Sequence, residues 1–370
     1  MITTTEDLKA LVSRARKTDA VALDTEFVWE RTYYPQLGLI QIALSDEDCE
    51  LIDPIAIEDL SPLGELLSDR GVVKILHDAP QDLAILYQAT GAAPQNIFDT
   101  RLAAGFSDLP ATLSLCNLIK ELLEIELPKT ETRTNWLRRP LNDKQVEYAL
   151  DDVRYLRAVR VLLLSRIIGP KIKSWLQEEL NLLNNPQTYI DNGNGERFRK
   201  IRGAGSLSRQ SLAILSELAQ WREAEAKKQD KPRGHIIKDN ILIAIAKKKT
   251  LNAEELSAKT GLSPKAQKRY GSKIVSLTLG TLESEEDSYP PLERSTRLSN
   301  RDKETLERLQ NLIELKSDLL GIDPILVGNM SELKSLAKLL SNSKATPLKQ
   351  LRQTTGWRKS FLEEFFHHNR

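Results

Sequence analysis

Two acidic side chains, Asp24 and Glu26, interrupt the apolar stretch 21–27, VALDTEF. In a β-strand, the alternation of side chains places both carboxylates on one side, about 6–7 Å apart along the backbone. Two negative charges held beside an apolar core repel each other, unless cations bind between them. Hard divalent ions such as Mg²⁺ prefer carboxylate oxygen ligands. A metal site is one interpretation of this spacing, but most such pairs are surface residues or caps, so it needs support from residues elsewhere in the chain.

Three side chains downstream could complete such a site. Asp82 lies in the first turns of an expected helix, and Tyr148 and Asp152 share one face of another, because they are four residues apart. Each has an ordinary alternative. Asp82 could favour a helix N-terminus, Tyr148 could be a core residue with its hydroxyl at the rim, and Asp152 could pair with Arg154 or Arg157. In this order and at these spacings, the set favours a functional site.

The elements that must position these side chains alternate between strand and helix over the first 165 residues. A long helix is expected in NDKQVEYALDDVRYLRAVRVLLL, with Asn142 or Asp143 as its N-cap. Apolar runs bounded by polar residues predict strands at 21–27, 39–44, 51–52, 72–76 and 97–98. The first three, which are joined by short connections, suggest an antiparallel meander. The expected fold of this half is therefore a mixed sheet flanked by helices.

The remaining residues have a helical pattern with a weak internal repeat. The segment 236–247 resembles 326–338, and helix-like stretches precede the two copies at 212–228 and 303–320. The repeat predicts two all-helical modules of about 75 residues each, and chance similarity between amphipathic helices is the alternative. Polar stretches typical of connections lie at 184–209 and 283–291.

Charge is distributed unevenly along the 370 residues. Residues 1–165 carry 17 Lys and Arg against 27 Asp and Glu, whereas the rest carry 36 against 25. This asymmetry suits an acidic half that holds cations and a basic half that attracts a polyanion, although two unrelated solvated surfaces would look the same. We expect no signal peptide and no membrane helix, because no sufficiently long apolar run is present. Cys49 and Cys116 lack metal-ligand spacing, which favours free thiols in a cytoplasmic setting.

The acidic motifs resemble those of a known family. Asp24-Thr25-Glu26, Asp82 and Tyr148-x-x-x-Asp152 are similar to the three exonuclease motifs of the DEDD superfamily, in its tyrosine subgroup. The histidine subgroup would carry His at position 147, which is Glu147 here. The similarity is greatest to the ribonuclease D family, and it extends to WERTYYPQLGLIQIAL, LHDAPQDL and NWLRRPLNDKQVEYALDDVRYL.

This resemblance implies an architecture for nearly the whole chain. It implies an α/β fold, the ribonuclease H-like mixed-sheet 3′→5′ exonuclease fold, followed by two all-α HRDC helical modules. The expected parts are an exonuclease domain at 1–170, a connecting segment at 171–208, a first HRDC module at 209–285 and a second, less similar module at 295–370.

The resemblance also implies a role for each site residue. Two divalent ions, Mg²⁺ or Mn²⁺, would be bound by Asp24, Glu26, Asp82 and Asp152, with Asp24 bridging them. Two such ions clamp the attacking and leaving oxygens of an in-line displacement. Tyr148 would orient the attacking water, because a phenol with a pKa near 10 is a poor base. His77 and Asp78 could shape the site or only pack.

The same resemblance implies the substrate. The enzyme would remove nucleotides from a free 3′-OH end of RNA, release 5′-monophosphates and act in 3′ maturation of precursor tRNA. We expect a monomer that works in the cytoplasm. We also expect it to use no NTP, because no Walker A loop is present. RNA phosphates would be contacted by basic clusters that contain Lys227, Lys228, Lys231, Arg233, Lys247, Lys248 and Lys249. The alternative is that these charges only make the helical modules more soluble. Two alternatives are an exonuclease acting mainly on DNA and an inactive RNA-binding scaffold, against which the complete acidic set counts.

Overall fold

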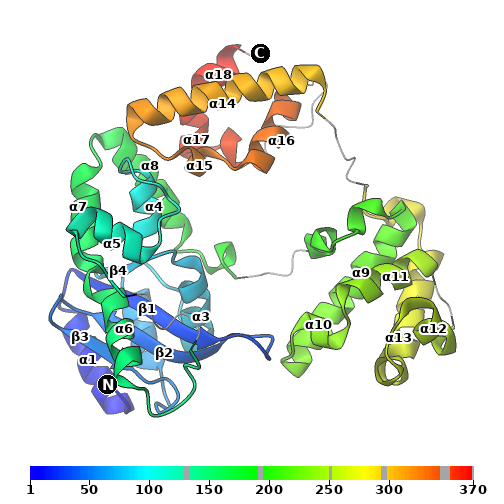
Figure 1. Cartoon of the computed structure of the whole chain (residues 1–370), viewed down its shortest axis with the longest axis horizontal. Coiled ribbons are helices and arrows are strands. Elements are labelled where there is room, and N and C mark those ends of the chain that lie inside the picture. Colours follow the sequence, from blue (N-terminus) through cyan, green and yellow to red (C-terminus); the bar gives the residue numbers. More distant parts are fainter. Residues whose placement is uncertain (129–133, 191–194, 250–251, 293–297, 342–350, 369–370) are drawn as a thin grey trace. The chain divides into compact units, whose positions relative to one another are not determined.

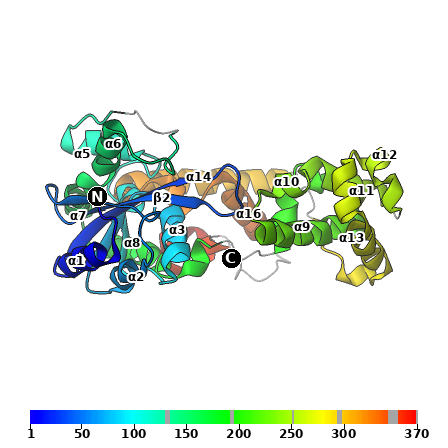
Figure 2. The same cartoon turned by 90° about the horizontal axis from the view of Figure 1, so that it is seen from below.

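The computed structural model describes residues 1–128, 134–190, 195–249, 252–292, 298–341 and 351–368 (Figure 1). Its internal contacts divide the chain into two compact units. Unit 1 comprises Met1–Val28, Leu37–Ile190 and Arg297–Arg370, and unit 2 comprises Trp29–Gln36 and Asp191–Thr296. Strands occur only in unit 1 among the described residues, apart from Gln36 at the start of β2, as the arrows in Figures 1 and 2 show.

A five-stranded mixed sheet forms the centre of unit 1. The strands are β1 (Ala20–Val28), β2 (Gln36–Ala43), β3 (Cys49–Ile52), β4 (Val73–Leu76) and β5 (Ile97–Asp99), in the order β3-β2-β1-β4-β5. Strand β3 pairs antiparallel with β2, whereas β4 pairs parallel with both β1 and β5. The mixed sheet expected from the apolar runs is therefore confirmed, and each predicted strand lies within a few residues of an observed one.

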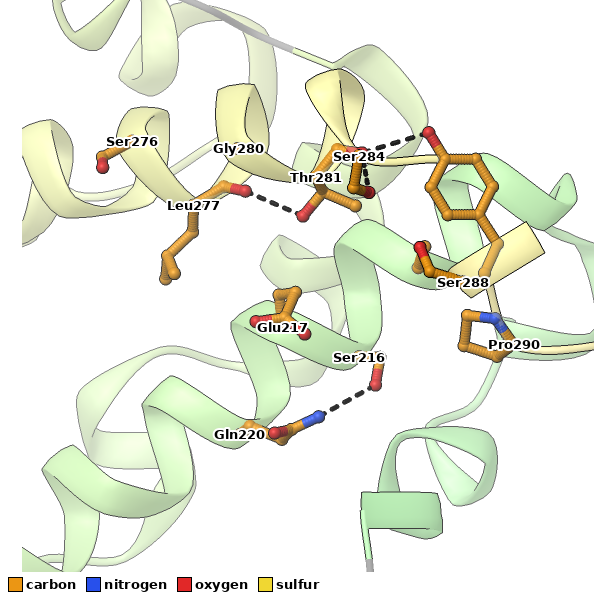
Figure 3. Close-up of a pocket in the computed structure, with 12 residues that line it drawn as sticks. Ser216, Glu217, Gln220, Ser276, Leu277, Gly280, Thr281, Ser284, Ser288 and Pro290 are labelled. Carbon is orange, nitrogen blue, oxygen red and sulfur yellow. Dashed lines mark hydrogen bonds between the residues drawn. The ribbon is translucent and has the colours of Figure 1, made fainter. Parts of the chain in front are cut away.

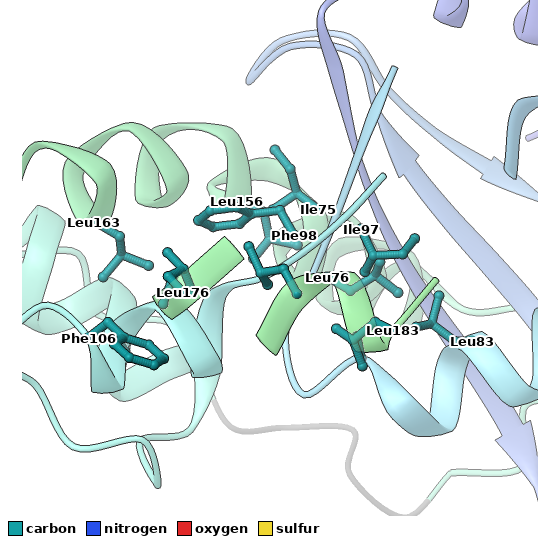
Figure 4. Packing of buried hydrophobic residues seen from close by; sticks show 14 of the residues in the cluster. Ile75, Leu76, Leu83, Ile97, Phe98, Phe106, Leu156, Leu163, Leu176 and Leu183 are labelled. Atoms are coloured by element: carbon teal, nitrogen blue, oxygen red, sulfur yellow. The ribbon is translucent and has the colours of Figure 1, made fainter. Parts of the chain in front are cut away.

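Helices surround this sheet. Those before the second half of the chain are α1 (Thr5–Ala15), α2 (Ser61–Ser68), α3 (Pro80–Thr90), α4 (Thr100–Gly105), α5 (Leu115–Leu123), α6 (Asp143–Arg154), α7 (Leu156–Arg166), α8 (Pro170–Leu182) and the short 3₁₀ helix η1 (Pro186–Thr188). Figure 4 shows how Ile75 and Phe98 of the sheet pack with Leu156 and Leu176 of the helices. The burial of these apolar side chains holds the strand ends and helix ends in fixed relative positions.

The single long helix expected after Asn142 is instead two helices, α6 and α7, which meet at Tyr155. Ala149 of α6 packs with Leu39 and Leu51 of strands β2 and β3. By contrast, α7 contacts α4, α5, β1 and β4, and its Val159 is buried in the main core. The chain bends at Tyr155 because the two apolar faces are buried against different elements.

The C-terminal helices belong to the same core as the sheet. They are α14 (Asn300–Leu320), α15 (Pro324–Val327), α16 (Met330–Ser341), α17 (Gly356–Phe361) and α18 (Glu363–His368), with the 3₁₀ helix η7 (Arg352–Thr354). Trp357 stacks near Trp175 of α8, with ring centroids 5.5 Å apart. The carboxylate of Glu179, also on α8, accepts hydrogen bonds from Trp357 Nε1 and from the guanidinium of Arg358. Because all of these groups are buried, the C-terminal helices are joined to α8 by a desolvated polar cluster.

Unit 2 is helical and has its own hydrophobic core. Its helices are η2 (Gly195–Lys200), η3 (Ala204–Ser206), α9 (Arg209–Gln229), α10 (Arg233–Ile236), α11 (Asp239–Lys248), η4 (Ala253–Glu255), α12 (Leu256–Thr260), α13 (Pro264–Glu283) and η5 (Glu286–Ser288). Tyr33 is buried in this core, and its hydroxyl donates a hydrogen bond to Glu223 of α9. The backbone N–H groups of Tyr33 and Tyr34 both donate to Asp230 Oδ1, at 3.0 and 3.1 Å.

The domain boundaries proposed from the sequence remain predictions. Most of the expected connecting segment 171–208 is helical in the structure, since α8 covers its start and η2 its later part. The expected boundary at 295 lies outside the described residues. Within the part of the chain that the structure describes, no helix is both long and apolar enough to cross a membrane.

Candidate active site

Strand β1 carries Asp24 and Glu26 beyond the part that pairs with β4. The parallel register joins Ala20 to Val73 and Ala22 to Ile75, and it stops there. The two carboxylates therefore lie where β1 continues alone on that side, next to the carboxyl end of β4. Both are half-buried, and each follows the alternation predicted for a strand.

Helix α6 brings Asp152 to the same place. The helix begins at a capping box in which Asn142 and Gln145 exchange hydrogen bonds, as the sequence predicted for Asn142. One carboxylate oxygen from each of Asp24, Glu26 and Asp152 lies within 4.8 Å of the others. Residues 128 positions apart in the chain thus converge on one acidic cluster, which we call the acidic trio.

The alternative role for Asp152 as an ion-pair partner does not match the structure. Arg154 lies 3.4 Å from Asp151, and Arg157 lies 3.0 Å from Asp19. Among the described residues, no Lys or Arg forms an ion pair with a member of the acidic trio. The negative charge of this cluster is therefore not neutralised by the protein itself.

Asp82 lies in the first turn of α3 and is buried, but it is not part of the acidic trio. Its Oδ1 accepts a hydrogen bond from the hydroxyl of Thr25, the residue between the two carboxylates of β1. This contact joins Asp82 to the strand that carries the trio. Thr25 was not predicted as a site residue, because strand alternation places it on the opposite side from Asp24 and Glu26.

Asp99 fixes the start of the helix that carries Asp82. Its buried carboxylate accepts the backbone N–H of Asp78 at 3.1 Å and of Ala79 at 2.9 Å, immediately before α3. It also caps α4 through the N–H of Arg101 at 2.8 Å. Asp99 therefore ties two helix starts to the end of β5. The sequence signal, an Asp directly before a helix, was present but was not linked to the site.

Burial and mutual repulsion dominate the electrostatics of the cluster. Burial raises the pKa of Glu26 to about 8, and the charges of Asp152 and Asp82 add to the rise. Burial likewise raises the pKa of Asp82 and of Asp152 to about 7 each. The pKa of Asp24 is raised well above its ordinary range, by burial and then by the neighbouring carboxylates.

Tyr148 faces the same cluster from α6. Its ring packs beside Trp136, with centroids 6.2 Å apart. Its hydrogen bond to Asp152 partly offsets the rise in the pKa of that carboxyl group. Burial, followed by the negative charges of Asp152 and Glu26, raises the pKa of the Tyr148 hydroxyl above its usual value near 10. The hydroxyl therefore stays protonated at neutral pH and acts as a hydrogen-bond donor.

His77 and Asp78 have structural partners. His77 Nδ1 lies 2.9 Å from Thr100 Oγ1, and its Nε2 lies 3.1 Å from the carbonyl oxygen of Leu113. Burial lowers the pKa of His77 to about 4, so the imidazole is neutral at physiological pH. Asp78 pairs with Arg101. These contacts favour packing over a direct role in the acidic cluster.

The donor set suits a hard divalent cation. It consists of carboxylate oxygens without compensating basic groups among the described residues, and Mg²⁺ and Mn²⁺ prefer such ligands. A cation would also remove the repulsion that raises the pKa values of the trio. The residues therefore fit the metal chemistry expected from the sequence.

The basic residues predicted to contact RNA lie at the ends of α9 and α11 and around α10 in unit 2. Arg233 pairs with Glu223, and it lies over the ring of Tyr33, as does Lys227. Lys249 donates a hydrogen bond to Gln210. The other four, which are exposed, are Lys228, Lys231, Lys247 and Lys248. Contact with RNA stays a prediction for all seven.

Comparison with known proteins gives the family. A family model described as 3′-5′ exonuclease matches residues 1–168, and one for the HRDC domain matches residues 211–278. Ribonuclease D of Desulfotalea psychrophila is 58% identical over 366 residues, which cover 99% of this chain and 97% of the relative. Ribonuclease D of Escherichia coli K12 is 31% identical over 371 residues, covering 99% and 97%.

Solved structures agree with the sequence comparison. The crystal structure of Escherichia coli RNase D, described as an exoribonuclease involved in structured RNA processing, matches with a TM-score of 0.87 at 30% identity. The match covers 100% of this chain and 97% of that one. The catalytic core of RRP6 from Trypanosoma brucei, at 21% identity and a TM-score of 0.59, shares the fold. The chain therefore belongs to the ribonuclease D family of 3′→5′ exoribonucleases.

Proposed function

We propose that the acidic trio and Asp82 bind two divalent ions, Mg²⁺ or Mn²⁺, and that RNA is hydrolysed from its 3′ end at this site. The observation that carries the proposal is the convergence of three carboxylate oxygens within 4.8 Å without a basic partner among the described residues. Burying such a cluster is unfavourable unless cations neutralise it. The side chains that would hold the ions are Asp24, Glu26, Asp82 and Asp152.

When bound, divalent ions neutralise charge on a phosphodiester and make water a better nucleophile at neutral pH. The protein contributes orientation. The single O–H of Tyr148, which donates to Asp152 in the metal-free protein, would turn to the attacking water once Asp152 binds a cation, and the ring of Trp136 beside it would keep the tyrosine in place. Thr25 and Asp99 keep Asp82 in place beside β1.

The substrate we propose is RNA with a free 3′-OH, from which nucleotides leave one at a time as 5′-monophosphates. Family membership supports this, and the Escherichia coli relative is described as acting in structured RNA processing. We infer precursor tRNA as the physiological substrate, and a monomer working in the cytoplasm as the active form.

A digestion ladder tests this proposal. RNA labelled at its 5′ end, with either a 3′-OH or a 3′-phosphate, is incubated with Mg²⁺ or with EDTA. We expect shortening one nucleotide at a time only from the 3′-OH and only with metal, and loss of activity in Asp24→Asn. The matched control is Asp46→Asn, which removes an exposed carboxylate outside the acidic cluster. Equal activity of Asp24→Asn and wild type would refute the metal assignment, and faster digestion of DNA of the same sequence would favour the DNA alternative.

A further inference from the structure

Unit 2 contains a pocket of about 520 Å³ with an unusual concentration of cationic side chains. Its lining includes five of them: Arg197, Lys200, Arg222, Arg233 and Lys238. Two carboxylates, Glu223 and Asp239, also line it. The formal charge of the lining is therefore +3, which favours an anion.

The two carboxylates of this basic pocket are already paired. Glu223 forms an ion pair with Arg233, and Arg197 lies 3.7 Å from the same carboxylate. Asp239 lies 2.7 Å from Arg222. Neither Lys200 nor Lys238 has an ion-pair partner in the part of the chain that the structure describes, and both are exposed. Because Arg197 and Arg233 share Glu223, one arginine charge and the two lysine charges make up the excess, and the lysines can turn toward a ligand.

Arg222 gives the pocket a fixed wall. It is only 5% exposed, and its Nη1 donates to the carbonyl oxygen of Ile237 at 2.8 Å and to Asp239 at 2.7 Å. Its Nε is buried and has no hydrogen-bond partner among the described residues. A buried guanidinium held by two bonds is already ordered, so it loses little conformational entropy when an anion binds nearby.

A second pocket of the same unit provides a contrast. It lies between α9 and α13 and is lined mainly by uncharged residues such as Ser216, Gln220 and Thr281 (Figure 3). Glu217 is its charged residue, and no Lys or Arg lines it. Of these two pockets, cations therefore gather in one and are absent from the lining of the other.

We propose that the basic pocket binds a phosphate group of the RNA backbone during catalysis. Two of its cations, Arg197 and Lys200, come from η2, upstream of the residues 211–278 that match the HRDC model. The segment expected only to connect domains thus supplies part of an RNA-binding site, one separate from the lysine clusters at the ends of α9 and α11. The proposal rests on the proposed function, in which RNA is the substrate.

The test measures RNA binding in EDTA, which prevents digestion. The full-length double variant Lys200→Gln/Lys238→Gln is compared with Lys265→Gln/Lys268→Gln, which removes the same charge from exposed positions on α13. Binding of a fluorescein-labelled single-stranded RNA is followed by anisotropy between 50 and 200 mM salt. Losing two phosphate contacts should reduce the magnitude of the slope of log binding constant against log salt concentration by about 1.4. It should also weaken RNA binding at 0.1 M salt roughly 10- to 30-fold. The control variant should keep the wild-type slope and affinity.

Equal losses in the two double variants, or no loss in either, would overturn the proposal. A parallel thermal melt in inorganic phosphate, with chloride at the same ionic strength as reference, separates the two sources of phosphate. Stabilisation by inorganic phosphate that the pocket variant loses, without any change in RNA binding, would assign the pocket to free phosphate and overturn RNA as its ligand. Failure of the proposed function is distinguishable, because wild type would then not shorten the same RNA when Mg²⁺ replaces EDTA.

Discussion

Replacing Glu26 by Gln should stabilise the metal-free protein while abolishing its activity. The pKa of Glu26 is raised from its ordinary value of 4.5 to about 8, first by burial and then by Asp152 and Asp82. A carboxyl group with a raised pKa in the folded state favours folding less and less as the pH rises from 4.5 to 8. Gln cannot ionise, so Glu26→Gln removes this pH-dependent loss.

The size of the effect follows from the shift. In the unfolded chain Glu26 has its ordinary pKa of 4.5, so pH 7 lies about 2.5 units above it and the group is ionised, whereas in the folded protein it stays mostly protonated. This difference corresponds to about 3 kcal/mol lost from the folding stability of wild type at pH 7. At pH 5 the same loss is less than about 1 kcal/mol. In thermal melts this predicts that Glu26→Gln raises the Tm by about 6 °C at pH 7 in EDTA and by much less at pH 5.

The matched control is Glu147→Gln, which neutralises an exposed carboxylate on α6 and should leave the Tm unchanged. Adding Mg²⁺ should raise the Tm of wild type more than that of Glu26→Gln, because a ligand stabilises only the protein that binds it. A Tm for Glu26→Gln at or below that of wild type in EDTA at pH 7 would refute the electrostatic reasoning.

Three further predictions concern residues around the site and in the C-terminal core. Asp99→Asn turns an amide N–H toward backbone N–H groups and loosens Asp82, so kcat should fall about 10- to 100-fold; an unchanged kcat would show that Asp99 does not position the site. Tyr148→Phe should lower kcat by about 10- to 100-fold while Mn²⁺ affinity, measured by titration, stays the same; a parallel loss of affinity would make the tyrosine a determinant of metal binding instead. Arg358→Met leaves the buried carboxylate of Glu179 without its cation and should lower the free energy of unfolding, measured by urea denaturation, by about 3–5 kcal/mol. A loss of about 1 kcal/mol or less, as expected of an exposed ion pair, would contradict the role of this cluster.

Much of the site could be predicted from the sequence because its signals are local. The alternation in β1 placed Asp24 and Glu26 together, and the helical spacing placed Tyr148 and Asp152 on one face. Helix α6 is held beside the sheet by the packing of Ala149 against Leu39 of β2 and Leu51 of β3, which no short window of sequence reveals.

The missed contributions depend on contacts between distant residues. Thr25 and Asp99 act by hydrogen bonding to Asp82 or to the backbone before α3, and the partners are 57 and 20 or 21 residues away. The burial of Tyr33 against α9 joins residues 190 positions apart. Such pairings follow from the three-dimensional fold, so composition and periodicity alone did not indicate them.

We expect the catalytic cations to bind at the acidic trio. Anomalous diffraction from crystals soaked in Mn²⁺ at pH 7.5 tests it most directly, because the ion is located without reference to activity. We expect anomalous peaks in contact with the carboxylates of Asp24, Glu26 and Asp152. Ordered Mn²⁺ found only elsewhere, or none at the trio at millimolar concentration, would contradict it.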